Sequence, residues 1–379
     1  MNILVSNVNQ FGQKDLSFEV SHKANISRHK KRKTMNKERI SFFGVKSLII
    51  TSLSVLVFSC TVQENRNKTR GDLLQVHADA TQSSFFENNP PNEQISEVVR
   101  MMFQDSKGNI WFGAQGGAFR LSNNTLSKID SIKSETGGRV TIHDITEGKD
   151  GKIWFGHTDG LSSYDGEIVK NYYESDGLLN NDVWNIESDT NGNIWIGTIE
   201  GLCKFNGDVF TTFELPEGIR DTTLGVSSTK MVHCIMEDSK GNIWFCTNAG
   251  LFRLKDNILH NASEKYGIKT NFINEIIESE KGGYWISTKE ALYKLAGDRL
   301  ENITEQVPEV GKGIGSISED KNGKLYFVFN QHYLHIYDGK EIIEFEKTED
   351  NKGPVVYQIY RDQNDRLWFL GFGGAYRLV

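Results

Sequence analysis

The sequence predicts an all-β fold: a seven-bladed β-propeller whose blades are four-stranded antiparallel sheets. A glycine turn followed by an aromatic residue recurs seven times, as in KGNIWFG at 107–113 and NGNIWIG at 191–197. Successive aromatics stand 41 to 49 residues apart, and apolar residues alternate in short runs, as strands require. A period near 40 with strand-like contents is typical of a propeller. These anchor aromatics are Trp111, Trp154, Trp195, Trp244, Trp285, Tyr326 and Trp368.

The third copy illustrates the four strands that each repeat is expected to build. Residues 181–189 form the innermost strand, and an Asn-Gly turn leads into a second strand over 194–198. A turn at 199–201 precedes a third strand over 202–207, and 208–215 complete the blade. Asn-Gly turns favour the hairpin geometry that matches strand twist. The anchor aromatic lies on the second strand, where we expect its ring to fill the space between neighbouring blades.

Closure of the ring is expected to use the segment ahead of the first repeat. The seventh copy stops at 375–379, after its third strand. Residues 82–87 (QSSFFE) resemble the outer strands over 210–214 and 343–346. We therefore expect 82–87 to supply the outer strand of the last blade, which removes the exposed strand edges of an open array.

The N-terminal part resembles an export signal of the lipoprotein type. Residues 35–59 combine a positive start with an apolar run, and Cys60 follows as the expected lipidated residue and membrane anchor. Residues 1–34 are expected to be an upstream extension from a misplaced start codon, 60–81 a flexible tether, and 82–379 the propeller. These features favour the cell envelope, as an outer-membrane lipoprotein facing the periplasm or the cell surface. An uncleaved signal anchor is the open alternative.

Charge and cysteine content restrict the partners. The formal net charge is −7, and because residues 1–59 carry +7, the remainder carries −14. An acidic body argues against nucleic acid, whose phosphates need clustered Lys and Arg. No Cys or Cys/His spacing suggests a zinc site, so no cofactor or metal is expected. Cys203 is expected to be a small buried hydrophobe, whereas Cys234 and Cys246 can face each other as free thiols or as a disulfide. We expect the body to be monomeric.

The consensus of the copies, VxxIxxDxxGxIWFGTxxGL, resembles the two-component regulator propeller repeat. This family occurs in the exported sensing portions of hybrid histidine kinases of Bacteroidota. The resemblance covers about 95–379 and is weaker in the fifth and sixth copies. It implies a propeller that senses a ligand, often a carbohydrate, outside the cytoplasm. No kinase or DNA-binding module follows Val379, so we expect no phosphorylation signalling by this chain on its own.

The candidate binding residues cluster, by prediction, around the mouth of the central channel. The position eleven residues before each anchor aromatic varies among polar and aromatic types, between two apolar neighbours. Such a slot suits a ring of ligand contacts, since Trp and Tyr offer flat faces and Arg, Asn and His offer hydrogen bonds. Simple filling of the blade interfaces is the equally open alternative. The predicted ligand-binding residues are Arg100, His143, Trp184, His233, Asn274 and Tyr357, joined from the turns between second and third strands by His157, Glu200, Gln331 and His332.

The expected function is that of an exported, lipid-anchored binding propeller without catalytic activity. Its partner is expected to be a carbohydrate or other small molecule, or an envelope protein. No Ser/His/Asp arrangement or phosphate loop is present in the sequence. The alternative is a streptogramin-lyase-like or hydrolase-like enzyme at the channel mouth, in which His143, His157, His233 and Glu200 supply acid and base groups. The aspartates before the first hairpin turns, such as Asp105 and Asp189, are interpreted as turn-stabilising residues rather than calcium ligands.

Overall fold

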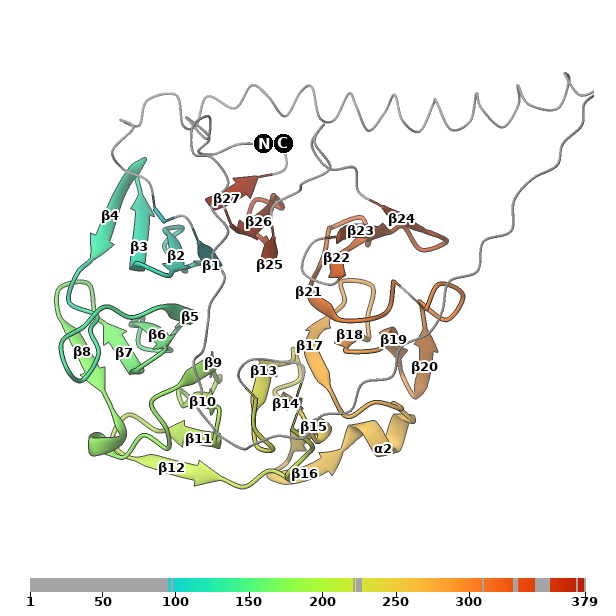
Figure 1. Ribbon diagram of the computed structural model, residues 1–379, viewed down its shortest axis with the longest axis horizontal. Helices are drawn as coiled ribbons and strands as arrows, with labels where there is room; N and C mark the ends of the chain where they lie inside the picture. The colour runs from blue at the N-terminus through green and yellow to red at the C-terminus, as the bar shows by residue number, and fades with distance from the viewer. Residues whose placement is uncertain are drawn as a thin grey trace, which may run out of the picture. The chain divides into compact units, whose positions relative to one another are not determined.

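The computed structural model describes residues 95–96, 98–220, 222, 227–308, 310–329, 333–344, 355–372 and 374–377. Within these residues, seven antiparallel sheets stand around a central axis, and the first sheet lies beside the last (Figure 1). The predicted all-β, seven-bladed propeller is confirmed.

The strands of each blade follow one another outward from the axis. The inner strands are β1 (Val99–Gln104), β5 (Ile142–Glu147), β9 (Val183–Ser188), β13 (Val232–Glu237), β17 (Ile273–Glu278), β21 (Ile314–Glu319) and β25 (Val356–Arg361). The second strands, which carry the anchor aromatics, are β2 (Ile110–Ala114), β6 (Ile153–His157), β10 (Ile194–Thr198), β14 (Ile243–Thr247), β18 (Tyr284–Thr288), β22 (Leu325–Phe329) and β26 (Leu367–Gly371).

The outer half of each blade is built in the same way. The third strands are β3 (Gly117–Ser122), β7 (Gly160–Tyr164), β11 (Gly201–Phe205), β15 (Gly250–Lys255), β19 (Leu292–Ala296), β23 (Tyr333–Tyr337) and β27 (Gly374–Arg377). The outermost strands are β4 (Thr125–Ile129), β8 (Val169–Tyr172), β12 (Phe210–Phe213), β16 (Ile258–Asn261), β20 (Arg299–Asn302) and β24 (Ile342–Glu344). A short 3-10 helix, η1 (Glu174–Asp176), and a one-turn helix, α2 (Ala262–Tyr266), follow β8 and β16.

The apolar core is divided among the interfaces between blades. Trp111 packs with Ile142, Ile145 and Phe155 of the second blade, and Trp368 of the seventh blade packs with residues of the first, including Val99. The other anchor aromatics are arranged likewise, and all seven are buried. Each aromatic therefore joins its own blade to the next, as the repeat pattern predicts.

An aspartate holds most of these tryptophans in place. Asp105 Oδ2 accepts a hydrogen bond from Trp111 Nε1 at 2.9 Å, while its Oδ1 accepts from the backbone N–H of Lys107 and of Asn109. The same indole–carboxylate bond recurs in the third, fourth and seventh blades. The interpretation of these aspartates as turn-stabilising residues is confirmed, and the structure adds the indole bond, which the sequence pattern did not reveal.

A ring of hydrogen bonds around the axis also joins the blades. The residue ten positions before an anchor aromatic accepts from the backbone N–H of the next blade. Asp144 Oδ2 accepts from Ile186 N at 2.8 Å, and Glu275 Oε2 accepts from Ile317 N at 2.8 Å. Asn185, Ser316 and Gln358 make the corresponding bonds in their blades. A buried amide that would otherwise lack a partner is satisfied in this way.

Burial makes two members of this ring hard to ionise. Removal of the carboxylate from water raises the pKa of Asp144 to about 7, against opposing hydrogen bonds from Ile186, Ile145 and Asn185. Burial likewise raises the pKa of Glu275 to about 7.

The cysteines lie as predicted. Cys234 and Cys246 face each other across paired strands, and all three described cysteines are free thiols. Burial raises the pKa of Cys203 to about 11, so this thiol stays protonated.

Several predicted segments fall outside the described residues: the extension 1–34, the signal 35–59, Cys60, the tether and the closing strand 82–87. In the described part of the chain, the seventh blade has three strands, and Val98 pairs with Phe372 of that blade. The chain therefore enters the ring beside the blade that 82–87 are predicted to complete. No helix in the described residues has the length and apolar character needed to cross a membrane.

Loss of an indole–carboxylate bond should destabilise the fold measurably. Asp189→Ala leaves Trp195 Nε1 buried without its acceptor. Asp320→Ala controls for the turn, because Asp320 accepts from the turn amides of Asn322 and Lys324 beside Tyr326, which has no indole, and Asn193→Ala controls for the Asn193 Nδ2 bond that Asp189→Ala also removes. We expect Asp189→Ala to lower the free energy of unfolding by about 1–3 kcal/mol more than Asp320→Ala, measured by denaturant titration. Equal losses would contradict the role given to the indole bond.

The contribution of Asp144 and Glu275 to stability should fall as the pH rises from about 4 to 7. The unfolded chain ionises Asp and Glu near pH 4, whereas Asp144 and Glu275 keep their protons in the folded state until about pH 7. Their stabilising contribution is thus complete below pH 4 and lost at 7. We expect the double variant Asp144→Asn/Glu275→Gln, which keeps the acceptor oxygens, to flatten this slope. Glu167→Gln, at an exposed turn, is the control; an unchanged slope in the double variant would refute the assignment.

Removal of the predicted closing strand should open the ring. We expect deletion of residues 82–90 to lower the melting temperature strongly, because the seventh blade would lose its outermost strand and expose the edge of β27. Thermal unfolding followed by circular dichroism measures this. A melting temperature equal to that of the intact chain would mean that another segment closes the last blade.

Candidate functional site

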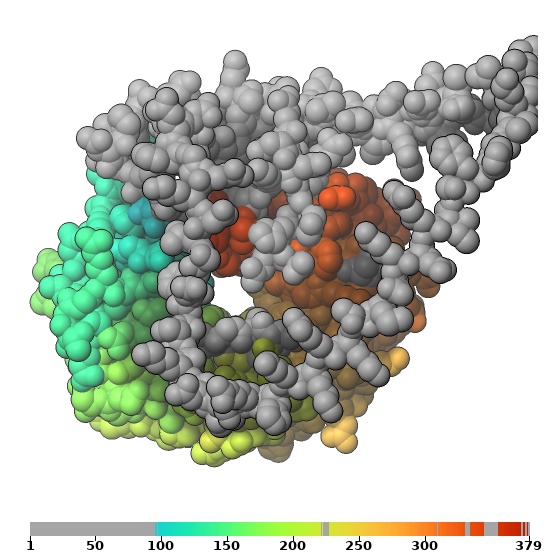
Figure 2. Space-filling view, in the orientation of Figure 1, coloured from blue at the N-terminus to red at the C-terminus, as the bar shows by residue number. Residues whose placement is uncertain are grey.

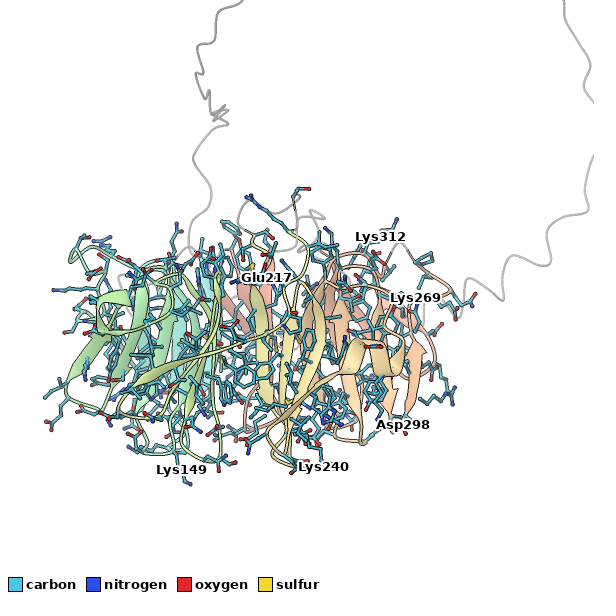
Figure 3. All side chains as sticks on the ribbon, turned by 90° about the horizontal axis from the view of Figure 1, so that it is seen from below. Lys149, Glu217, Lys240, Lys269, Asp298 and Lys312 are labelled. Atoms are coloured by element: carbon cyan, nitrogen blue, oxygen red, sulfur yellow. The ribbon has the colours of Figure 1, made fainter. Side chains whose placement is uncertain are left out.

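The two faces of the ring carry different loops. The inner strands begin on one face of the ring, and the turns between second and third strands lie on the same face, which we call the mouth face. Glu217, Lys269 and Lys312 lie on this face in Figure 3. Lys149 and Lys240, from first hairpin turns, lie on the opposite face (Figure 3). The space-filling view shows an opening at the centre of the ring (Figure 2). The starts of the inner strands and the aspartate turns thus lie on opposite faces of the ring.

A β-bulge explains why the slot residues vary. In the second blade Ile142 pairs with His157 and Asp144 with Gly156, so His143 has no partner in the strand ladder. The register shifts at the slot position in all the other blades as well. A bulge turns its extra side chain away from the regular sheet faces. Slot side chains are therefore partly exposed, while the apolar neighbours on either side of each slot are buried in the blade interfaces.

The slot residues of the second and third blades form a stacked pair. The rings of His143 and Trp184 lie 4.6 Å apart with an interplanar angle of 30°. Nδ1 of His143 lies 2.9 Å from the carbonyl oxygen of Val183, and this contact requires the tautomer that carries the proton on Nδ1. Burial lowers the pKa of His143, so the ring is neutral at pH 7.

A second aromatic–donor pair lies where the seventh blade meets the first. The guanidinium carbon of Arg100 stands 5.1 Å from the ring centre of Tyr357. Tyr357 in turn lies 5.8 Å from Phe372, which is 47% exposed on the turn between β26 and β27. A cation over an aromatic face is mutually attractive and holds both side chains in place.

The remaining slot residues bond to loops and backbone. His233 Nε2 lies 2.5 Å from Asn248 Oδ1, on the turn that follows β14. Asn274 Nδ2 donates to the carbonyl oxygen of Ile314 in the next blade at 2.6 Å. The Asn274 contact joins two blades, whereas the His233 contact lies within the fourth blade. At least one slot side chain therefore contributes to a blade interface, as the alternative interpretation predicts.

Two buried donors at the mouth lack acceptors. Arg100 Nε and Trp184 Nε1 have no hydrogen-bond partner among the described residues. A buried donor without an acceptor costs about 1–3 kcal/mol. Both atoms belong to the aromatic–donor pairs, so an acceptor that enters the mouth would remove this cost.

Three buried carboxyl groups of the inner strands have raised pKa values. Asp144 and Glu275 belong to the hydrogen-bonded ring described above, and burial raises the pKa of Glu187 to about 8, with further contributions from Asp144, Glu237 and Asp189. In the described residues no group of three or more His, Cys, Asp or Glu side chains is arranged to hold a metal ion.

His157 does not line the mouth, contrary to its predicted placement. Its side chain is fully buried, with Nε2 2.9 Å from Ser162 Oγ, which donates to Asn171 Oδ1. Burial lowers the pKa of His157 to about 3. Strand β6 continues through His157, so this residue is the last of a strand rather than part of the turn, and its side chain packs inside the blade.

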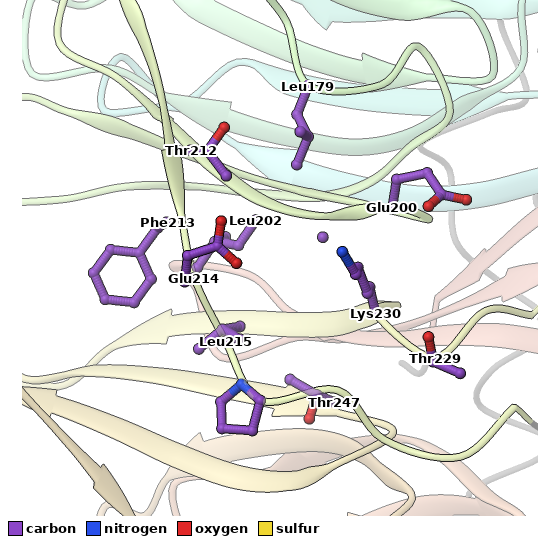
Figure 4. Close-up of a pocket in the computed structure, with 12 residues that line it drawn as sticks. Leu179, Glu200, Leu202, Thr212, Phe213, Glu214, Leu215, Thr229, Lys230 and Thr247 are labelled. Carbon is purple, nitrogen blue, oxygen red and sulfur yellow. The ribbon is translucent and has the colours of Figure 1, made fainter.

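Glu200 lies at the edge of a different hollow. It is exposed, and it lines a cavity of about 110 Å³ between the third and fourth blades together with Lys230, Thr229 and Leu179 (Figure 4). Gln331 and His332, the last two predicted mouth residues, lie outside the described residues.

An inserted loop at the mouth face was missed by the sequence analysis. Of the described residues between β12 and β13, Gly218 N donates to Thr229 O, and Ile219 N donates to Asn248 O on the turn of the fourth blade. A side chain at Gly218 would lie 2.2 Å from the backbone of Asn248, so only glycine fits there. The 49-residue spacing between Trp195 and Trp244 was the available signal.

The comparisons with known proteins agree with this geometry. The family model for the two-component regulator propeller matches residues 93–116, 177–200 and 225–249, which fall in the first, third and fourth repeats. No curated protein matches the chain.

Solved structures share the fold. The extracellular domain of a putative hybrid two-component system from B. thetaiotaomicron is 23% identical, with a TM-score of 0.57, over 79% of this chain and 40% of that one. The extracellular domain of a putative one-component system from the same organism is 18% identical, with a TM-score of 0.58, over 74% of this chain and 38% of that one. Streptogramin B lyase is 14% identical, with a TM-score of 0.57, over 74% and 92%.

This chain spans about two fifths of the length of the two B. thetaiotaomicron domains, and the likeness to all three structures concerns the fold. The matched repeats coincide with blades whose inner strands, bulges and aspartate-held tryptophans recur in register. The chain is therefore a seven-bladed propeller, three of whose repeats match the model of the two-component regulator propeller.

Proposed function

We propose that this protein is an exported propeller that binds a ligand at the channel mouth and performs no catalysis of its own. The observation that carries the proposal is the bulge in every inner strand, which in six of the seven blades frees one variable, partly exposed side chain while its apolar neighbours stay buried; the sixth blade has Gly315 there. Bulges of this kind re-aim side chains next to functional sites.

The chemistry of the mouth suits a carbohydrate or a similar polar, flat ligand. Trp184 and Tyr357 offer aromatic rings, and each stands beside a hydrogen-bonding partner, His143 or Arg100. The unpartnered Nε atoms of Arg100 and Trp184 would donate to ligand hydroxyl or carbonyl oxygens. The match of three repeats to the two-component regulator propeller supports a sensing role, and the similar B. thetaiotaomicron structures are extracellular domains of putative one- and two-component systems.

Export and anchoring belong to the same proposal. The segment 35–59 has the layout of a signal, and Cys60 is the residue that would be lipidated. Anchoring would place the propeller in the cell envelope, where it meets a soluble ligand or an envelope protein.

The enzyme alternative has less support from the site. Of the four residues that would supply acid and base groups, His157 is buried within its blade, and Glu200 lies at a separate hollow. His143 is engaged by Val183 and Trp184, and His233 by Asn248. Incubation with candidate lactones and oligosaccharides tests the alternative directly, because any product would exclude a purely binding role.

Replacement of a mouth aromatic should abolish binding without loss of the fold. A thermal-shift screen of glycans and peptides identifies a ligand first. We then expect Trp184→Ala to weaken binding by about tenfold or more, since a lost aromatic stacking contact costs on the order of 1–3 kcal/mol. Isothermal titration calorimetry measures the change.

Two further variants make this test specific. His233→Ala removes a second slot side chain and should also weaken binding. Val209→Ala is the matched control, because Val209 is a 52% exposed apolar residue at the turn before β12, on the other face. Unchanged affinity in both Trp184→Ala and His233→Ala would place the ligand elsewhere on the propeller.

A further inference from the structure

The second blade lacks the carboxylate that holds tryptophan in four of its sister blades; the fifth blade, with Ser279 before Trp285, lacks it too. Gly148 stands where Asp105, Asp189, Asp238 and Asp362 stand in the first, third, fourth and seventh blades. Trp154 keeps the same position on the second strand, stacked on Tyr172 at 5.6 Å. Its Nε1 has no hydrogen-bond acceptor among the described residues, whereas the indoles of those four blades donate to aspartate at 2.8–2.9 Å.

A cleft opens at this point, on the face opposite the mouth. It has a volume of about 330 Å³ and lies between the second and third blades. Gly148 and Trp154 line it from one side, and Ile194 and Phe205 line it from the other. Lys149 and Lys152 stand at its edge, so the cleft combines an apolar floor, one indole N–H and two cationic side chains.

The sister blades show which contacts a carboxylate makes in this position. In the third blade, Asp189 accepts from Trp195 Nε1 at 2.9 Å, from the backbone N–H of Asn193 at 2.8 Å and from Asn193 Nδ2 at 2.7 Å. In the seventh blade, Arg366 Nε takes the place of the asparagine amide, at 2.7 Å from Asp362. Lys152 occupies the position of Asn193 and Arg366 in the second blade, so its ammonium would donate to a carboxylate bound there.

We propose that this cleft binds the carboxylate of a small ligand, which takes the place of the missing aspartate. The ligand oxygen would accept from Trp154 Nε1 and pair with Lys152, while Lys149 adds positive charge at the edge. Both the uronic-acid type of sugar and the C-terminus of a peptide supply such a group. The cleft is separate from the channel mouth, so the proposal does not depend on the function assigned to the mouth.

One side chain of the protein competes for the same donors. Asp150 accepts from Lys152 Nζ at 2.5 Å and from Lys152 N at 3.2 Å. It makes no hydrogen bond with Trp154, and its side chain is 52% exposed. Asp150 can therefore turn toward solvent when a ligand carboxylate enters, at the modest cost of an exposed ion pair.

The indole N–H of Trp154 reports binding directly. The chain has seven tryptophans, so a ¹⁵N-correlated spectrum of the purified full chain contains seven indole resonances. Trp154→Phe, which keeps an aromatic ring in the core, identifies its resonance by loss. We expect galacturonate to shift this resonance in a saturable manner and galactose to leave it in place. A tripeptide with a free C-terminus, compared with its amide, tests the second source of carboxylate.

A substitution that restores the internal carboxylate should close the site. The backbone of Gly148 is not in the left-handed region, and an added Cβ would lie 2.9 Å from Asp150 Oδ1 and from Trp154 Nε1, so these side chains must shift to admit it. We expect Gly148→Asp to shift the Trp154 resonance permanently and to abolish the response to both probes. Lys152→Gln should weaken binding at least fivefold, whereas the control Lys107→Gln, at the equivalent turn of the first blade, should not.

Three results would overturn the proposal. These are an absence of any shift with either carboxylate probe, an equal shift with galactose or the peptide amide, and a response to the probes that survives Gly148→Asp. The Trp184 resonance, identified by Trp184→Ala, reports the mouth in the same spectra. Failure of one site is thus distinguished from failure of the other.

Discussion

The structure depends on the burial of one aromatic residue per blade against the next blade. A single four-stranded sheet cannot bury its apolar faces alone, so each blade needs both neighbours. The seven interface clusters, each built around an anchor aromatic, supply that contact. Where the aromatic is tryptophan, its indole N–H is a buried donor, and a carboxylate on the preceding turn satisfies it in four blades. The same aspartate shapes the hairpin, so turn geometry and interface packing are joined in one residue.

Because the packing residues and the slot residues are different, the slot side chains can differ from blade to blade. Apolar residues on both sides of each slot are committed to the interfaces, and the next residue toward the turn bonds across to the neighbouring blade in most of the ring. The bulge releases only the slot residue from the strand ladder. Substitution there changes the chemistry of the mouth with little cost to packing, which is the arrangement expected of a binding scaffold. In the second blade, Gly148 replaces the aspartate, and the indole N–H of Trp154 then lies beside a cleft on the face opposite the mouth.

Individual residues show where sequence reasoning reached its limit. Arg100, His143, Trp184, His233, Asn274 and Tyr357 were found from their spacing alone, and the structure places all six at the bulges. His157 was misplaced because the end of a strand cannot be located from the pattern to within one residue. The acceptors Asp144 and Glu275 were overlooked, since a polar residue between apolar neighbours looks solvent-facing until the next blade is in place.

The sequence by itself determined the number of blades, the order of strands in each and the aromatic that joins them. These follow from periodicity and turn chemistry, which act over a few residues. Only the tertiary structure decided that His143 stacks on Trp184, that Arg100 meets Tyr357 where the seventh blade meets the first, and that Ile219 bonds to Asn248. Such contacts join blades some 40 or more residues apart, and their geometry depends on the twist and spacing of whole sheets, which no local pattern encodes.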